Sequence, residues 1–309
     1  MVLEDRHSVC AAIAEDGFAL IKKPFPASWI DDLVRRADIV NDSPAIGGAV
    51  GYQVVDFPRK VLNPCTVLGG PVLDLILHHS LLDLVEELMG SECILAQAGM
   101  RYDKGVGYNY FPLHSDFAAG WTHGEQFVLQ QTHMERVLSV GCLLYLTPSR
   151  EGAFCYLRGT HRLHAPKGSE WSNYSSDEQA SMIANRVRVD GELGDLVMFD
   201  PRGFHGPDLP SSKPRLALIF HFYNTEVFGR RQLAPFPVYA ADLGRLSPRQ
   251  LRVLGVGAET FYDPLRFMGN RIRRTNAYRI SRILVANAFL SEHLRRKLRA
   301  TWLTLRKTF

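Results

Sequence analysis

One histidine and one carboxylate lie two residues apart in the segment 109–117, NYFPLHSDF. His114 and Asp116 would project from the same face of an extended strand, because successive side chains of a strand alternate between its two faces. An imidazole and a carboxylate held side by side are two of the three ligands in the two-histidine, one-carboxylate site that binds Fe(II). Such a site leaves three metal positions open, which suits a chelating 2-oxo acid together with O2.

The third ligand must come from a distant strand, and His205 is the candidate. It follows an apolar run and a glycine turn in GDLVMFDPRGFHG at 194–206, and 89 residues separate it from Asp116. A jelly roll can bring two strands at this separation side by side. His114, Asp116 and His205 are therefore the predicted metal ligands and catalytic residues.

Arg215 lies ten residues beyond His205, in the otherwise apolar segment KPRLALIFHF at 213–222. Burial of a guanidinium on an apolar strand is costly unless an anion accompanies it. Arginine presents its N–H groups as a planar fork that matches a carboxylate. Arg215 is therefore predicted to bind the distal carboxylate of 2-oxoglutarate.

The segments that must position these residues change character near Cys93. Before it, residues 8–17, 26–40 and 72–88 show helical spacing, and FALIKK at 18–23 alternates like a single short strand. After it, apolar, β-branched and aromatic runs bounded by Gly, Pro and Asp predict strands. These runs are 93–103, 136–147, 152–160, 195–200 and 214–224. Strands after a helical lead indicate an α+β chain with a sandwich or barrel core.

Four segments resemble the phytanoyl-CoA dioxygenase-like branch of the iron and 2-oxoglutarate oxygenases, across residues 94–224. They are LHSD at 113–116, EGAFCYLRGTHR at 151–162, GDLVMFDPRGFHG at 194–206 and KPRLALIFHF at 213–222. The resemblance implies a double-stranded β-helix, a cupin-like jelly roll, with N-terminal helices. It also implies an enzyme that uses Fe(II), 2-oxoglutarate and O2 to hydroxylate an aliphatic C–H bond.

The same resemblance bears on four single residues. Gln97 and Arg101 lie on the strand before the His-x-Asp motif, which contributes to the co-substrate and substrate pocket in the family. Arg158 stands where the family's Gly-Ser/Thr-His turn usually opens with Pro, which places a charge near the pocket and makes Arg158 a candidate substrate contact. Related halogenases have a small residue at the position of Asp116, so the carboxylate here implies hydroxylation.

Two interpretations are open for residues 117–136, which are aromatic and polar. The segment is either a surface loop or a lid over the substrate pocket, since long loops in compact domains are often functional. As part of a lid, Trp121, His123 and His133 would be candidate substrate contacts.

Other residues near the motifs have structural interpretations. His161 is expected to hydrogen bond within its GTHR turn, His164 to be exposed, and His221 to be a half-buried sheet residue. Gly152 and Gly159 are expected to serve backbone turns.

A strongly basic tail follows the predicted domain of residues 1–263, which divides into a helical lead over 1–90 and a jelly-roll core over about 91–225. Residues 264–309 contain 12 Lys and Arg against one acid, whereas the formal net charge of the whole chain is +4. Apolar and basic residues in this tail have helical spacing, so basic amphipathic helices are predicted. Such helices bind an anionic membrane surface, the protein body or a second subunit. The lack of a base-reading motif argues against nucleic acid.

The rest of the composition indicates a cytoplasmic protein. The opening MVLEDRHSV lacks the apolar region of a signal peptide. No apolar run approaches the roughly 18 residues needed to span a bilayer. The five cysteines are scattered and form no CxxC pair, which argues against a disulfide framework and against a zinc knuckle.

The favoured function is a 2-oxoglutarate-dependent hydroxylase that acts on a lipid or lipid-linked sugar, such as a lipopolysaccharide precursor, at the cytoplasmic membrane surface. This substrate is suggested by relatives in the family and by the basic tail. One alternative is a hydroxylase of a soluble secondary metabolite or an acyl-CoA. Another is a non-catalytic jelly-roll sensor of metal or 2-oxoglutarate. A third is a structural zinc cupin, which would leave Arg215 unexplained.

Overall fold

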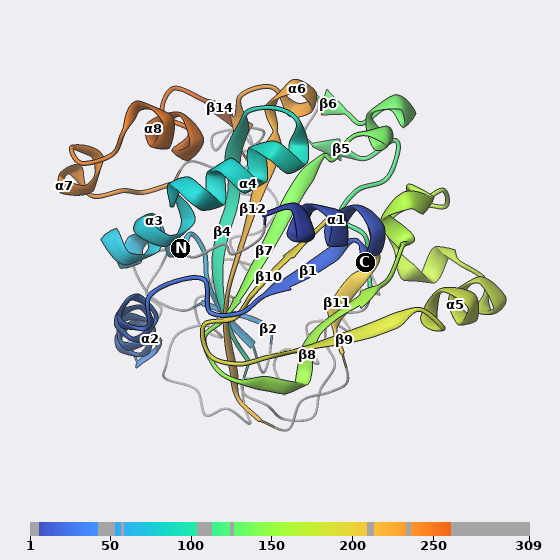
Figure 1. The fold of residues 1–309 in the computed structure, drawn as a ribbon, viewed down its shortest axis with the longest axis horizontal. Coiled ribbons are helices and arrows are strands. Elements are labelled where there is room, and N and C mark those ends of the chain that lie inside the picture. The colour runs from blue at the N-terminus through green and yellow to red at the C-terminus, as the bar shows by residue number, and fades with distance from the viewer. Residues whose placement is uncertain are drawn as a thin grey trace, which may run out of the picture.

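Two antiparallel sheets form the core of the computed structural model, which describes residues 6–42, 53–56, 59–103, 113–123, 127–208, 213–232 and 236–260. The large sheet has seven strands, in the spatial order β1-β10-β7-β12-β4-β3-β2 (Figure 1). Their bounds are β1 Phe18–Ile21, β10 Leu196–Phe199, β7 Ser139–Tyr145, β12 Arg215–Asn224, β4 Cys93–Asp103, β3 Arg59–Leu62 and β2 Gln53–Asp56. The small sheet contains β11 His205–Pro207, β8 Ser149–Leu157 and β9 Arg186–Gly191.

Side chains of the large sheet alternate between two apolar layers. On β7, Val140, Cys142 and Leu144 pack against helices, whereas Leu143 and Tyr145 pack against residues of the small sheet. The helices over the outer face of the large sheet are seen in front of it in Figure 1. They include α1 Arg6–Asp16, α3 Gly70–Ile76 and α4 His79–Met89, while α2 Ala27–Asp42 lies at one edge. Because side chains alternate along a strand, odd-numbered residues of β7 and of β12 up to His221 face the space between the sheets.

Shorter elements connect the strands. Two small two-stranded sheets pair β5 Thr122–His123 with β6 Phe127–Val128, and β13 Arg231–Gln232 with β14 Glu259–Thr260. Among the described residues, the remaining α-helices are α5 Ser176–Ile183, α6 Thr225–Phe228, α7 Ala240–Leu243 and α8 Pro248–Leu254. The same part of the chain contains the 3-10 turns η1 Cys65–Leu68, η2 Gln131–Glu135, η3 Thr160–Leu163 and η4 Trp171–Asn173. All five cysteines are free. Within the described ranges, no helix combines the length and the apolar character needed to cross a bilayer.

The lead before β4 differs from the prediction in two ways. It supplies three strands to the large sheet, whereas the sequence indicated only β1; β2 and β3 are four residues each and lack a clear alternating pattern. The helix predicted over 72–88 is two helices, α3 and α4. The break is at His78, whose ring accepts a hydrogen bond from the Ser80 amide at 3.2 Å and so caps the start of α4. The predicted basic helices of 264–309 lie outside the described residues.

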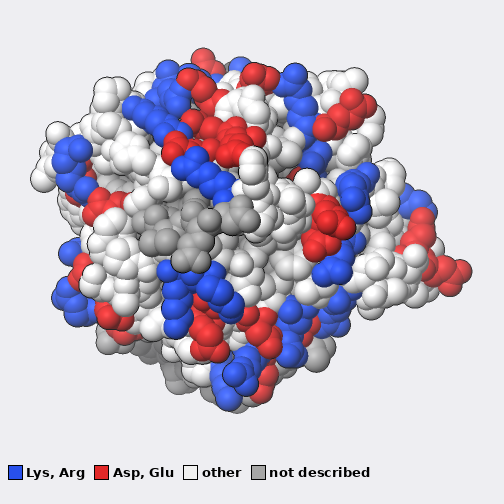
Figure 2. All heavy atoms as spheres, viewed as in Figure 1, with Lys and Arg blue, Asp and Glu red and all other residues white. Residues whose placement is uncertain are grey.

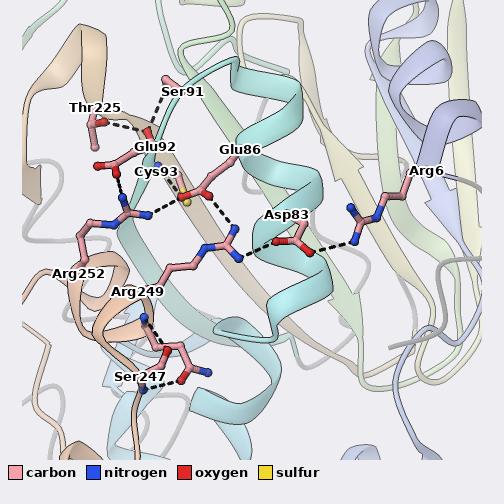
Figure 3. Close-up of polar contacts among 11 residues, drawn as sticks. Arg6, Asp83, Glu86, Ser91, Glu92, Cys93, Thr225, Ser247, Arg249 and Arg252 are labelled. Atoms are coloured by element: carbon pink, nitrogen blue, oxygen red, sulfur yellow. Dashed lines mark hydrogen bonds and ion pairs between the residues drawn. The ribbon is translucent and has the colours of Figure 1, made fainter.

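A network of ion pairs fastens α8 to α4 (Figure 3). The Arg249 guanidinium donates to Asp83 Oδ1 and to Glu86 Oε2, both at 2.6 Å. Arg6 of α1 donates to the other oxygen of Asp83 at 3.0 Å, and Arg252 donates to Glu86 Oε1 at 2.9 Å. Three helices that are distant in the sequence are thereby held together on the outer side of the large sheet.

Replacing Arg249 with Gln is expected to lower the free energy of unfolding by roughly 1–2 kcal/mol at pH 7, because two half-exposed carboxylates lose a shared partner. The hydrogen bond from Arg249 holds the pKa of Asp83 below its usual range, despite the opposing effect of burial. A lowered pKa stabilises the folded state above the unfolded pKa, and this contribution disappears as the pH falls below about 4. The difference in free energy of unfolding between wild type and Arg249→Gln, measured by urea unfolding, should therefore be smaller at pH 3.5 than at pH 7. Arg230→Gln, an exposed residue bonded to the Val256 carbonyl, is the control.

Candidate metal and co-substrate site

The His-x-Asp segment is fixed to the residues around His205 through its backbone. His114 and His205 exchange two hydrogen bonds, with N···O distances of 3.1 and 2.9 Å. The Asp116 amide donates to the Pro201 carbonyl at 2.9 Å. Ser115 is buried and its hydroxyl donates to the Arg202 carbonyl at 2.9 Å. The start of β11 and the loop before it therefore position all three predicted ligands.

The side chains of His114, Asp116 and His205 converge on one point. His114 Nε2 lies 3.4 Å from Asp116 Oδ1, and His205 Nε2 lies 3.9 Å from Asp116 Oδ2. One ligand atom from each residue lies within 4.8 Å of the others. His205 Nδ1 lies 2.9 Å from the Gly203 carbonyl. Because a carbonyl can only accept, Nδ1 carries the proton and Nε2 keeps its lone pair, as is usual for a metal-binding histidine.

Electrostatics favour the forms of His205 and Asp116 that bind a cation. Burial lowers the pKa of His205 to about 3, with a further contribution from His114, so its imidazole is neutral at physiological pH. Burial opposes ionisation of Asp116. The hydrogen bond from His114 and the nearby His205 and His221 outweigh it and hold the pKa of Asp116 below its usual range. Imidazole nitrogens with one carboxylate are the donor set that suits Fe(II), so the residues present fit this metal.

A glycine is required two residues before His205. A Cβ atom built on Gly203 would lie 1.9 Å from the Tyr156 hydroxyl oxygen. That hydroxyl donates to the Asp200 carbonyl at 2.8 Å, and the Tyr156 ring stacks on His205 with centroids 6.4 Å apart. Tyr156 therefore packs against the loop that carries His205 and leaves no room for a side chain at position 203.

The inner face of the large sheet carries the predicted co-substrate residues. Gln97 is the register partner of His221, and Arg101 is the partner of Ala217, so both lie on the same face as Arg215. Arg215 itself is paired with Asp103: its Nη2 and Nε lie 2.6 and 3.1 Å from Asp103 Oδ2. The sequence analysis did not single out Asp103, although this carboxylate is the anion that accompanies the arginine.

His221 is closer to the site than predicted. It was expected to be half-buried, but only 8% of the residue is exposed, and its Nδ1 lies 3.8 Å from Asp116 Oδ2. Burial lowers its pKa. The signal was present in the sequence: His221 is six residues from Arg215 on the same strand, so both side chains lie on one face.

Two of the predicted substrate contacts share a neighbour, since the rings of Trp121 and His133 lie 6.5 and 6.2 Å from that of Phe127, whereas Arg158 pairs elsewhere. Trp121 packs in an aromatic cluster, 5.3 Å from the Phe117 ring centroid. The His133 ring accepts a hydrogen bond from the Gln130 amide at 3.1 Å. Arg158 is half-exposed, and its Nε lies 3.0 Å from Asp16 Oδ1 of α1. For His123, only its backbone place in β5 is described. Their roles toward substrate stay predictions.

The described parts of the segment 117–136, residues 117–123 and 127–136, are folded against the core. Phe117, Leu129 and Met134 are buried with Tyr223 and Phe228, at the end of β12 and in α6. These residues therefore cap the end of β12 that lies next to Asp116, and their role as a lid over the substrate pocket stays a prediction.

Other structural expectations can be compared directly. Gly152 and Gly159 have positive φ angles of 65° and 76°, as expected for turn glycines. His161 does not bond within its turn: its Nε2 donates to the Ala14 carbonyl of α1 at 3.1 Å. His164 is partly buried, with φ at 55°. These two histidines therefore lie outside the ligand group.

Comparison with known proteins identifies the family. The family model for phytanoyl-CoA dioxygenase (PhyH) matches residues 13–215, which is more than half of the chain. The chain therefore belongs to the phytanoyl-CoA dioxygenase family. It is a 2-oxoglutarate-dependent dioxygenase that uses Fe(II), 2-oxoglutarate and O2. Comparison with curated proteins gave no match.

Solved structures share the fold. EctD from S. alaskensis with bound Fe has a TM-score of 0.58 and 19% identity, covering 74% of this chain and 80% of EctD. HygX from Streptomyces hygroscopicus, with nickel, 2-oxoglutarate and hygromycin B bound, has a TM-score of 0.54 and 15% identity, covering 71% and 87%. The epimerase SnoN from nogalamycin biosynthesis has a TM-score of 0.53 and 16% identity, covering 71% and 83%. The predicted α+β jelly-roll fold is confirmed.

Proposed function

We propose that His114, Asp116 and His205 bind Fe(II) and that Arg215 binds the distal carboxylate of 2-oxoglutarate. The convergence of three ligand atoms within 4.8 Å carries this proposal. Fe(II) bound there supplies the oxidative decarboxylation of 2-oxoglutarate by O2 to succinate and CO2, coupled to oxidation of a substrate C–H bond. The protein contributes by holding His205 in the tautomer with a free Nε2, by keeping Asp116 ionised, and by offering a cation on the inner face of β12.

Gln97 and Arg101 are proposed to line the same pocket. Both lie on the inner face of β4, beside the strand that carries Arg215 and His221. The cap, formed by residues 117–123 and 127–136, is proposed to close the pocket at the metal end, and Trp121, His123 and His133 are proposed to contact the substrate there. Arg158 fits this role less well, because Asp16 already binds its guanidinium.

The proposed substrate is a lipid or a lipid-linked sugar, such as a lipopolysaccharide precursor, hydroxylated at the cytoplasmic face of a membrane. The support is the tail 264–309, whose 12 basic residues and single acid suit an anionic lipid surface. On the face of the body seen in Figure 2, Lys and Arg lie among Asp and Glu. Attraction to an anionic membrane is therefore proposed to come from the tail.

The reaction is tested by measuring succinate from anaerobically purified protein given Fe(II), ascorbate, 2-oxoglutarate and then O2, without added substrate. Slow turnover that disappears in His205→Ala but persists in His79→Ala, an exposed histidine on α4, is the expected result. A wild-type protein that neither forms succinate nor binds 2-oxoglutarate when loaded with Fe(II) would instead support the non-catalytic sensor.

Membrane binding is tested by co-sedimentation of the full chain with vesicles of phosphatidylcholine containing anionic phosphatidylglycerol. Binding should fall in a variant with Arg295, Arg296, Lys297 and Arg299 changed to Gln, and should fall for both proteins as salt is raised. Equal sedimentation of the two proteins would remove the membrane from the proposal. It would favour a hydroxylase of a soluble metabolite or acyl-CoA, in line with the hygromycin B bound in HygX.

A further inference from the structure

The ion pair between Asp103 and Arg215 lies at one end of the inner face of the large sheet. The two residues are register partners on β4 and β12. Their side chains are only 6% and 14% exposed, so both charges are largely removed from water. A third charge brought to this place interacts strongly with both residues, because the protein interior screens charges far less than water does.

The pair is incomplete. Both N–H donors, Nε and Nη2, go to one carboxylate oxygen, Oδ2. The other oxygen, Oδ1, is buried and accepts no hydrogen bond from any described residue. A matched arginine–carboxylate pair would use both oxygens in parallel. The arrangement leaves Nη1 outside the pair and leaves an unsatisfied anionic oxygen beside it.

We propose that Asp103 determines the affinity for 2-oxoglutarate by competing with the distal carboxylate of this co-substrate for Arg215. This inference rests on the proposed role of Arg215. An entering carboxylate must approach the guanidinium within the field of the Asp103 carboxylate, and the like charges repel. Asp103 therefore weakens binding, and turnover responds to 2-oxoglutarate over a higher range of concentration than Arg215 alone would set.

If Asp103 instead positions Arg215 for binding, neutralising Asp103 changes the Kd for 2-oxoglutarate in the opposite direction. If Asp103 only positioned Arg215, its neutralisation would leave the guanidinium misplaced, and 2-oxoglutarate would bind more weakly. Competition predicts tighter binding when Asp103 becomes neutral. The direction of the change in Kd therefore separates the two roles.

The experiment is calorimetric titration of 2-oxoglutarate into the full-length, Fe(II)-loaded protein without O2. In Asp103→Asn we expect a Kd at least about fivefold lower than in the wild type, the lower end of typical coupling between sites. Binding of pyruvate, a 2-oxo acid without a distal carboxylate, should not change. Asp103→Ser, which also removes the charge but has a smaller side chain, is measured in parallel, with circular dichroism to verify that both variants fold. An unchanged or higher Kd in the folded variants would overturn the proposal.

Arg215→Gln separates this inference from the proposed function. If Arg215→Gln weakens 2-oxoglutarate binding but Asp103→Asn does not strengthen it, only the competition is wrong. If Arg215→Gln leaves the Kd unchanged, Arg215 is not the anchor and both proposals fail. In the double variant, the gain from Asp103→Asn should vanish, since the residue for which the carboxylates compete is gone.

Discussion

Replacing Asp116 with alanine is expected to abolish Fe(II)-dependent succinate formation and to weaken Fe(II) binding. The carboxylate lies between three imidazoles, with His114, His221 and His205 at 3.4, 3.8 and 3.9 Å from its oxygens. It is the only acidic residue in the metal-binding group found among the described residues. Its loss removes one of the three proposed ligands and the one negative charge that offsets the charge of Fe(II).

Asp116→Glu provides a graded test of geometry. It keeps the charge but moves the carboxylate by one methylene, a displacement on the order of 1 Å that typically costs about 100-fold in rate. Turnover, measured by succinate release, should therefore be highest in the wild type, lower in Asp116→Glu and lowest in Asp116→Ala. Fe(II) affinity, measured by anaerobic titration, should follow the same order. Asp177→Ala, an exposed position in the first turn of α5, is the control and should match the wild type. Succinate formation retained in Asp116→Ala would show that the Asp116 carboxylate is not required for turnover and would overturn its assignment as an essential ligand.

Local patterns predicted the strands that form the sheet core. The run 93–103 coincides with β4, and 214–224 contains β12, because long apolar runs bounded by Gly, Pro and Asp have few alternatives to a buried strand. The three-residue β11 and the charged β9 were missed, because neither contains an apolar run long enough to be distinguished from a loop.

The metal ligands were predictable because each lies in a motif with its own spacing. The residues that surround them were not, because their contacts depend on strand register. Asp103 meets Arg215 only because β4 and β12 pair with those two residues opposite each other, across 112 positions of sequence. For His221, the strand pattern placed the side chain on the face of Arg215 but could not place it beside Asp116. A single sequence indicates which residues of one strand share a face, but it does not indicate which residues of two strands lie opposite each other.

Contacts of the candidate substrate residues also depended on distant elements. Arg158 departs from the family pattern, and a role near the pocket was a reasonable hypothesis. In the structure, Asp16 at the end of α1 binds its guanidinium. His161 similarly reaches back to Ala14. The turn that carries these residues therefore fastens α1 to the small sheet, which no spacing within the turn could indicate.

Arg202→Met is expected to lower the free energy of unfolding by about 3–5 kcal/mol, the usual cost of leaving a buried ion without its partner. Arg202 and Asp200 are 7% and 1% exposed at their side chains. Arg202 Nη2 donates to Asp200 Oδ2 at 2.5 Å, and Nη1 donates to the Met134 carbonyl at 2.6 Å. The residue therefore links the cap to the loop that holds His205. Fe(II) affinity should fall together with stability, as measured by guanidinium unfolding and metal titration.

Two further variants show whether the loss comes from the buried charge. Arg188→Met breaks a similarly spaced pair with Asp190 on β9, but its side chains are 48% and 44% exposed, so stability should barely change. Asp200→Asn combined with Arg202→Met should be more stable than Arg202→Met alone, because the remaining partner no longer carries a buried charge. If the double variant were no better, the loss would instead come from the contact with Met134. The cap, rather than the ion pair, would then be what stabilises the ligand loop.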